Sequence, residues 1–210
     1  MLLIPRQRIA YRLTQLVFGL AMFGFGIALM VVADLGLSPW QTLHQGISAR
    51  TGVAIGTVTI ITGIVVLLGW IPLRERIGLG TVLNVAIIGN ALNLSLEVLP
   101  DQLDSLVARW VTMVCGVGLI GLASGLYIGV RMGPGPRDGL MTGLARRGIN
   151  IGVVRTILEI TVLAVGWHLG GTVGFGTIVF AVAIGPLIAY FLPRFTVKPV
   201  TRVTAEARLS

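Results

Sequence analysis

Cysteine, histidine and charged side chains are scarce in this sequence, and each shortage excludes a class of site. Cys115 is the single cysteine and stands inside an apolar run, which excludes an intrachain disulfide and a thiolate metal cluster and favours a packing role. The two histidines, His44 and His168, lack the spacing of metal ligands. The sequence contains no Walker loop, HExxH motif or Ser/His/Asp pattern. We therefore expect no metal, no cofactor and no enzymatic activity.

The low charge is matched by a large apolar content. Hydrophobic residues make up 55% of the chain and charged residues only 11%, with a mean hydropathy of +0.93. Such a composition suits a lipid bilayer rather than water. The net charge of +8 would suit nucleic acid only if the basic residues shared a soluble face, and most of them instead flank long apolar runs. The sequence thus predicts an integral membrane protein and argues against nucleic-acid binding.

Six apolar stretches are long enough to cross the bilayer, whose hydrocarbon core of about 30 Å takes about 20 helical residues. They cover residues 13–33, 53–73, 77–96, 110–130, 149–169 and 172–192. Basic residues precede the first stretch as in a signal peptide, but its apolar run is too long for one and lacks a clear cleavage site. We expect a single all-α membrane domain over residues 1–210, ending in a basic tail over 194–210.

The distribution of arginine and lysine predicts the orientation of the chain. With a cytoplasmic N-terminus, thirteen of the sixteen basic residues fall on the cytoplasmic side. Arg50 and Arg109 fall on the opposite side, and Arg155 lies within a span. By the positive-inside rule both termini are cytoplasmic, as expected for a multi-pass protein of the bacterial inner membrane.

The two halves of the chain repeat one another. A shift of 97 residues keeps arginine, glycine and proline in one register, with the equivalent pairs Arg12 and Arg109, Gly36 and Gly133, and Pro39 and Pro136. After a one-residue slip, ARTGVAIG at 49–56 lies on ARRGINIG at 145–152. Apolar low complexity alone does not keep such a register. We therefore predict two three-span repeats, at about 12–100 and 109–193.

Because each half has three spans, the second half enters the membrane from the opposite side, and the repeat is inverted. Many secondary transporters are inverted repeats that bind their substrate near the midplane, between short broken helices in matching positions. The alternative is that duplication only produced a stable bundle with no transport role.

A short helix is predicted between the first and second spans of each half. Ser38 is the candidate N-cap of the first, with Pro39 at its first helical position, and Gly135 and Pro136 take these places in the second. A helix of about a dozen residues is too short to cross, so it either lies in the interface or enters the bilayer as a re-entrant hairpin.

The N-terminus of each short helix suits an anionic ligand, because free N–H groups and the positive end of the helix dipole meet there. Arg131 and Arg137 would add positive charge near the second one. The alternative is an interfacial helix whose arginines contact lipid phosphates. Asp138, at the third helical position, is interpreted first as a structural cap of the free N–H groups.

Polar residues inside spans are the remaining candidates. Glu159 lies near the middle of the fifth span, where an ionisable side chain costs a few kcal/mol and must face protein or water. It is a candidate binding or gating residue together with Arg155 on the same helix face, and a structural ion pair is the alternative. In the third span, Asn90 and Asn93 could hold a ligand, but hydrogen bonds that join helices are the favoured role.

Residues at the ends of spans carry weaker predictions. Asp34 and Arg131 occupy equivalent positions and are either gates of opposite sides or interfacial anchors. The four tryptophans are interpreted as membrane-interface residues: Trp40, Trp70, Trp110 and Trp167. A stripe of small residues on the fourth span predicts close helix packing against the glycines of the first span: Gly121, Gly125, Gly129 and Gly133.

Three features together resemble a known family. They are the six spans, GLSPW at 36–40 after the first span and, most specifically, GPGPRDGL at 133–140 after the fourth. Over nearly its whole length the chain is similar to the YczE/YyaS/YitT group of bacterial integral membrane proteins, and without the C-terminal soluble domain of YitT-type members it is nearer to YczE and YyaS. The resemblance implies the membrane architecture and supplies no substrate.

These observations predict a secondary transporter that moves a small polar or anionic solute by alternating access. Two alternatives stay open: an accessory or scaffold protein that binds a partner through its basic face, and a lipid-handling protein. The expected partners are the lipid bilayer, a small solute and, as an open alternative, a second copy of the chain.

Overall fold

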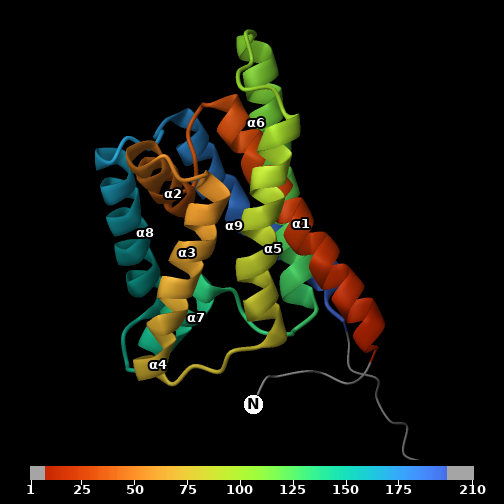
Figure 1. Cartoon of the computed structure of the whole chain (residues 1–210). Coiled ribbons are helices and arrows are strands. Elements are labelled where there is room, and N and C mark those ends of the chain that lie inside the picture. The colour runs from red at the N-terminus through yellow and green to blue at the C-terminus, as the bar shows by residue number, and fades with distance from the viewer. Residues whose placement is uncertain (1–7, 198–210) are drawn as a thin grey trace, which may run out of the picture.

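The computed structural model describes residues 8–197, which form an all-helical bundle (Figure 1). Its helices are α1 (Ile9–Ala33), α2 (Pro39–Thr51), α3 (Ile55–Leu68), α4 (Trp70–Leu73), α5 (Leu79–Val98), α6 (Leu106–Gly129), α7 (Pro136–Ala145), α8 (Ile151–His168) and α9 (Phe175–Phe195). With α3 and α4 counted together, six helical segments are long and apolar enough to cross a membrane. The six predicted spans are therefore confirmed as helices, while most of the predicted basic tail, residues 198–210, lies outside the described residues.

The boundaries follow local chemistry. Both short helices begin with proline at the first helical position, as predicted, and α2 ends at Gly52 in the left-handed conformation with φ of 70°. The structure differs from prediction at the second span, which breaks at Gly69 into α3 and α4. The cause is Pro72, which lacks an N–H group and whose ring excludes the carbonyl four residues earlier, at Leu68.

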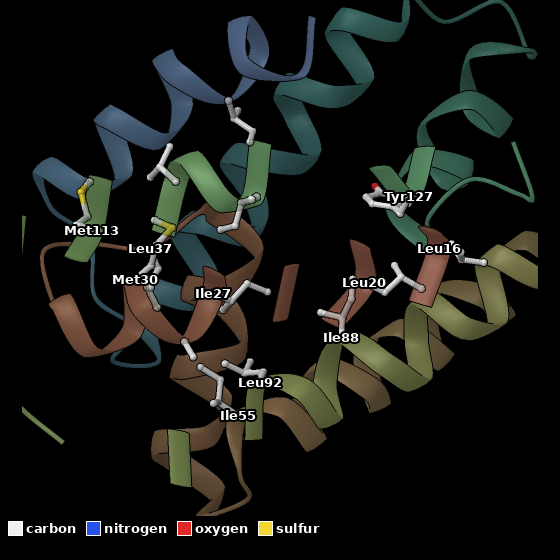
Figure 2. Close-up of a cluster of buried hydrophobic side chains, with 14 of the residues drawn as sticks. Leu16, Leu20, Ile27, Met30, Leu37, Ile55, Ile88, Leu92, Met113 and Tyr127 are labelled. Atoms are coloured by element: carbon white, nitrogen blue, oxygen red, sulfur yellow. The ribbon is translucent and has the colours of Figure 1, made fainter. Parts of the chain in front are cut away.

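The core lies around α1, which packs against α5 on one side and α6 on another. Figure 2 shows Leu16, Leu20 and Ile27 of α1 pointing into this core, together with Ile88 and Leu92 of α5. Buried aliphatic contact of this kind gives the long helices fixed neighbours, because protein interiors are packed about as densely as organic crystals.

Glycines allow the closest helix contacts, but the helix predicted to pack against the glycine stripe of α6 is wrong. A Cβ atom at Gly121 would lie 2.6 Å from the Leu187 side chain, and one at Gly125 would lie 2.7 Å from that of Phe191. The small-residue stripe of α6 therefore packs against α9 rather than against α1. The fourth predicted member, Gly133, lies beyond the helix and has φ of 124° in the following loop.

Equivalent helices of the two halves make equivalent contacts. The contact of α1 with α5 matches that of α6 with α9, and the contact of α2 with α3 matches that of α7 with α8. Each short helix also crosses to the other half, since α2 packs on α8 and α7 packs on α3.

The loops before the short helices interlock the two halves. The Gly176 N–H at the start of α9 donates to the Leu35 carbonyl at 2.7 Å, and the Gly80 N–H at the start of α5 donates to the Met132 carbonyl at 2.8 Å. Gly36 has φ of 117°, close to the value at Gly133, so both loops need the left-handed freedom of glycine.

The halves differ in how their last two long helices meet. In the first half, α3 and α5 cross so closely that a Cβ atom at Gly56 would lie 2.0 Å from the Gly89 carbonyl oxygen. The equivalent residues of the second half, 96 positions later, are Gly152 and Gly185. Around Gly185 nothing lies within 4 Å of a Cβ atom, and α8 and α9 form no extended contact within the described residues. Figure 1 shows α8 at the outer edge of the bundle, beside α2 and α7.

Three further sequence-based predictions need correction. Trp40 and Trp70 are buried at 7% and 1% exposure, so the membrane-interface prediction is wrong for both. Trp70 is buried because its indole N–H donates to the Pro136 carbonyl at 2.9 Å and its ring lies against Gly139. Cys115 is exposed on the outward face of α6 and has no packing role in the core.

Candidate functional site

Both short helices begin at one cavity of about 120 Å³. Ser38 and Pro39 at the start of α2 line it together with Gly135 and Pro136 at the start of α7. Long helices supply the rest of its wall, including residues in the middle of their spans: Phe23, Asn84, Ile88, Ile120, Ser124, Tyr127, Arg155, Glu159, Phe180, Ile184 and Ile188. The cavity therefore lies inside the helix bundle, where the two halves meet.

Each helix start at the cavity lacks an N-cap side chain that accepts a hydrogen bond. Gly135 has no side chain to offer, and the Ser38 hydroxyl donates to the Gln41 side-chain oxygen instead. The first turn of a helix carries N–H groups without partners in the helix itself. Two positive dipole ends therefore face the same small space, which favours an anion, although the Asp138 carboxylate in the first turn of α7 offsets part of one of them.

Arg137 is the charged residue placed between the two helix starts. Its guanidinium lies 5.4 Å from the centre of the Trp40 ring, within the range of a cation–π contact. Among the described residues this guanidinium forms no hydrogen bond and no ion pair within 4 Å, although the carboxylates of Asp138 and Glu159 lie near enough to act on its charge. A partly buried guanidinium that no carboxylate contacts directly keeps its hydrogen-bond donors available, so the position suits an anionic ligand.

A second, smaller cavity of about 30 Å³ continues behind Trp40 and Arg137, which line both spaces. Two buried polar atoms here lack partners within the described residues: the Trp40 indole nitrogen and Nε2 of His44, a residue that is 2% exposed. The other ring nitrogen of His44 contacts the Thr59 hydroxyl at 3.0 Å. Buried polar groups are nearly always hydrogen-bonded, so these two atoms are available to a polar ligand or to water.

Two carboxylates complete the wall of the larger cavity. Asp138 accepts a hydrogen bond from the Tyr127 hydroxyl at 3.4 Å and lies beside Gly135 at the start of α7, where the capping role was predicted. Glu159 pairs with Arg155 at 2.9 Å, with side-chain exposures of 34% and 57%. The Arg155–Glu159 pair anticipated from the spacing is therefore present, and both partners line the cavity.

The structure thus brings seven of the eleven predicted site residues to one cavity. They are Ser38, Pro39, Pro136, Arg137, Asp138, Arg155 and Glu159.

The other four predicted residues lie elsewhere. Asp34 pairs with Arg109 at 3.0 Å, and Arg131 is exposed at the end of α6. Asn90 is exposed, and its side chain donates back to Ala86 of its own helix. Asn93 accepts a hydrogen bond from the Gly56 N–H at 2.8 Å and so joins α5 to α3, the role that was favoured for it.

Sequence reasoning missed further cavity residues, among them Trp40, Tyr127 and Asn84. Trp40 carried a signal, because it stands next to the predicted N-cap and proline, yet it was assigned to the membrane interface. Tyr127 and Asn84 carried none, since a single polar group within an apolar span does not reveal which way it faces.

Six membrane-crossing helices with an interior cavity lined by both polar and apolar residues define a multi-pass α-helical membrane protein embedded in the lipid bilayer. The chain belongs to DUF6198, a family of unknown function whose model matches residues 10–193.

Curated relatives extend this assignment. An uncharacterized protein of Haemophilus influenzae is 40% identical over 178 residues, covering 84% of this chain and 81% of the relative. The uncharacterized membrane protein YczE of Bacillus subtilis is 33% identical over 193 residues, covering 90% of this chain and 89% of the relative. YyaS of the same organism is 26% identical over 181 residues, covering 83% and 89%. The predicted resemblance to the YczE/YyaS side is thus confirmed, and no solved structure matches.

Proposed function

We propose that this protein is a secondary transporter that moves a small anionic solute across the membrane by alternating access, without catalysing a reaction. The observation that carries the proposal is the position of Arg137, which makes no direct ion pair among the described residues and stands where α2 and α7 both begin. Backbone N–H groups and a guanidinium together provide the donors that recognise carboxylate or phosphate oxygens.

An inverted repeat would explain how such a site can face either side. The matched contacts of the two halves support this architecture, and the short helices then enter the bilayer from opposite sides as re-entrant hairpins with their N-termini at the midplane. The tight α3–α5 contact and the separated α8 and α9 fit one state of a rocking bundle, with the other state reversing them. The basic residues favour cytoplasmic termini in the inner membrane.

Purified protein reconstituted in liposomes tests the proposal. A panel of chloride, formate, acetate and inorganic phosphate is offered, and both saturable uptake and thermal stabilisation are measured. Arg137→Gln should weaken binding by about 1.5–3 kcal/mol, roughly 10- to 150-fold in affinity, because hydrogen bonds to a charged donor are lost.

Arg131→Gln is the matched control, since Arg131 is an exposed arginine outside the cavity. It should bind and transport as the natural chain does. Transport is rejected if no anion is taken up, and an anion site at Arg137 is rejected if both variants behave alike. A protein that co-purifies in stoichiometric amount would instead support the scaffold alternative.

A further inference from the structure

The cavity wall has two chemically different sides. One side holds the starts of α2 and α7 with Arg137 and Asp138, while a separate apolar part of the wall is built by Phe180, Ile184 and Ile188 of α9. An inorganic anion would satisfy the first side and leave the second without an apolar partner. These two parts of the lining therefore match a molecule with an anionic end and an apolar end.

The apolar side continues to the outside of the bundle. Because α8 and α9 form no extended contact within the described residues, the edge of α9 next to Ile188 is uncovered, with Ala181 and Gly185 exposed. Gly185 has open space where a side chain would stand. Both helices are long and apolar enough to span a bilayer, so acyl chains surround this edge.

The size of the cavity limits what fits inside. Its volume of about 120 Å³ is slightly below the roughly 150 Å³ of an engineered cavity that binds benzene. A compact headgroup with a few carbon atoms fills it, and a longer chain would have to extend beyond the cavity, whose lining includes residues of both α8 and α9.

We propose that the ligand is an amphiphilic anion, whose headgroup binds beside Arg137 and whose unbranched apolar chain passes between α8 and α9 toward the bilayer. The inference rests on the anion site of the proposed function and names the class of solute that this site takes. It also gives the separation of the two helices a role, because a ligand can then enter from the membrane as well as from water.

A series of straight-chain carboxylates with two, four, six and eight carbons tests the inference. Binding is measured on the full chain in nanodiscs of zwitterionic lipid, and Arg137→Gln nanodiscs supply the correction for uptake by the bilayer. The affinity should rise about fourfold per added methylene, the change that corresponds to about 0.8 kcal/mol. Uncharged alcohols of the same lengths should show no binding that depends on Arg137.

Gly185→Leu should block the path of the chain, so that acetate binds as before while the gain from six to eight carbons is lost. Gly118→Leu is the matched control, because Gly118 on α6 likewise has nothing within 4 Å of a Cβ atom and lies outside the cavity. Ala181→Leu, one turn before Gly185, is a second blocking variant should the first not fold.

Equal affinities for acetate and octanoate would overturn the proposal that the ligand is amphiphilic. The ligand would then be a small anion that enters from water, in agreement with the proposed function. A gain that persists in both blocking variants would overturn the path between α8 and α9. If neither the carboxylates nor the inorganic anions bind in a way that depends on Arg137, the proposed function itself fails.

Discussion

The contact of α3 with α5 is closed, whereas the equivalent helices α8 and α9 stand apart. Both pairs carry glycines at equivalent positions, so the backbone of either pair can approach closely. The difference lies in the side chains. Helix α3 has no charged residue, while α8 carries Arg155 and Glu159 toward the cavity, and burying that ion pair against an apolar helix would cost free energy. The two halves thus share one helix arrangement, and charged residues present in α8 but not in α3 account for the separation of α8 from α9.

The largest expected effect comes from filling the closed contact. Gly89→Leu places a side chain where a Cβ atom alone would lie 2.4 Å from the Gly56 carbonyl oxygen, so it should destabilise the protein by at least about 1–3 kcal/mol. Gly185→Leu, at the equivalent open position, should change the thermal unfolding midpoint little. Equal losses in both variants would show that α8 and α9 also pack closely in the membrane.

Glu159→Gln should abolish transport while the protein stays folded, because the amide keeps the shape of the side chain but carries no charge. The Arg155–Glu159 pair is partly exposed, so its loss should change the free energy of unfolding by less than about 1 kcal/mol. Liposome uptake and thermal unfolding separate the two effects. Full transport in the double variant Arg155→Met with Glu159→Gln would mean that Glu159 only neutralises Arg155.

Asn93→Ala should loosen the closed pair, since the Asn93 side chain accepts from Gly56 and donates to Thr57 at 3.2 Å. Hydrogen bonds between membrane helices contribute about 0.6–1.7 kcal/mol, so a loss of that size is expected in thermal unfolding. Asn90→Ala, one turn earlier and exposed, should be neutral. If Asn90→Ala is as damaging as Asn93→Ala, the contact does not explain the effect.

The smallest effect is expected at the exposed pair of Asp34 and Arg109, where Asp34→Ala should cost about 0–1 kcal/mol. Added salt should reduce the difference from the natural chain, because exposed charges are screened. A cost that does not change with salt would indicate instead that the loop after α1 depends on the Asp34 hydrogen bond from Thr172.

Much of this architecture could be predicted from local chemistry. The length of the apolar stretches predicted the spans, and proline after a candidate N-cap predicted the starts of α2 and α7. The meeting of Arg137 with Trp40 could not be predicted, because it depends on how α7 and α2 approach one another across the two halves. The partner of the glycine stripe was missed for the same reason, since a small residue shows that something comes close but not which helix it is.

The interlocked loops have a consequence for synthesis. The Leu35 carbonyl stays without its partner until Gly176 has been made, 141 residues later in the chain. Most of the chain must therefore be synthesised before the loop after α1 can reach its final structure. Until then the first half lacks this hydrogen bond in the loop after α1, so we expect it to be more open to quality-control proteases than the complete chain. A gene split between α5 and α6 should yield a first half that is degraded alone and survives only when the second half is made with it.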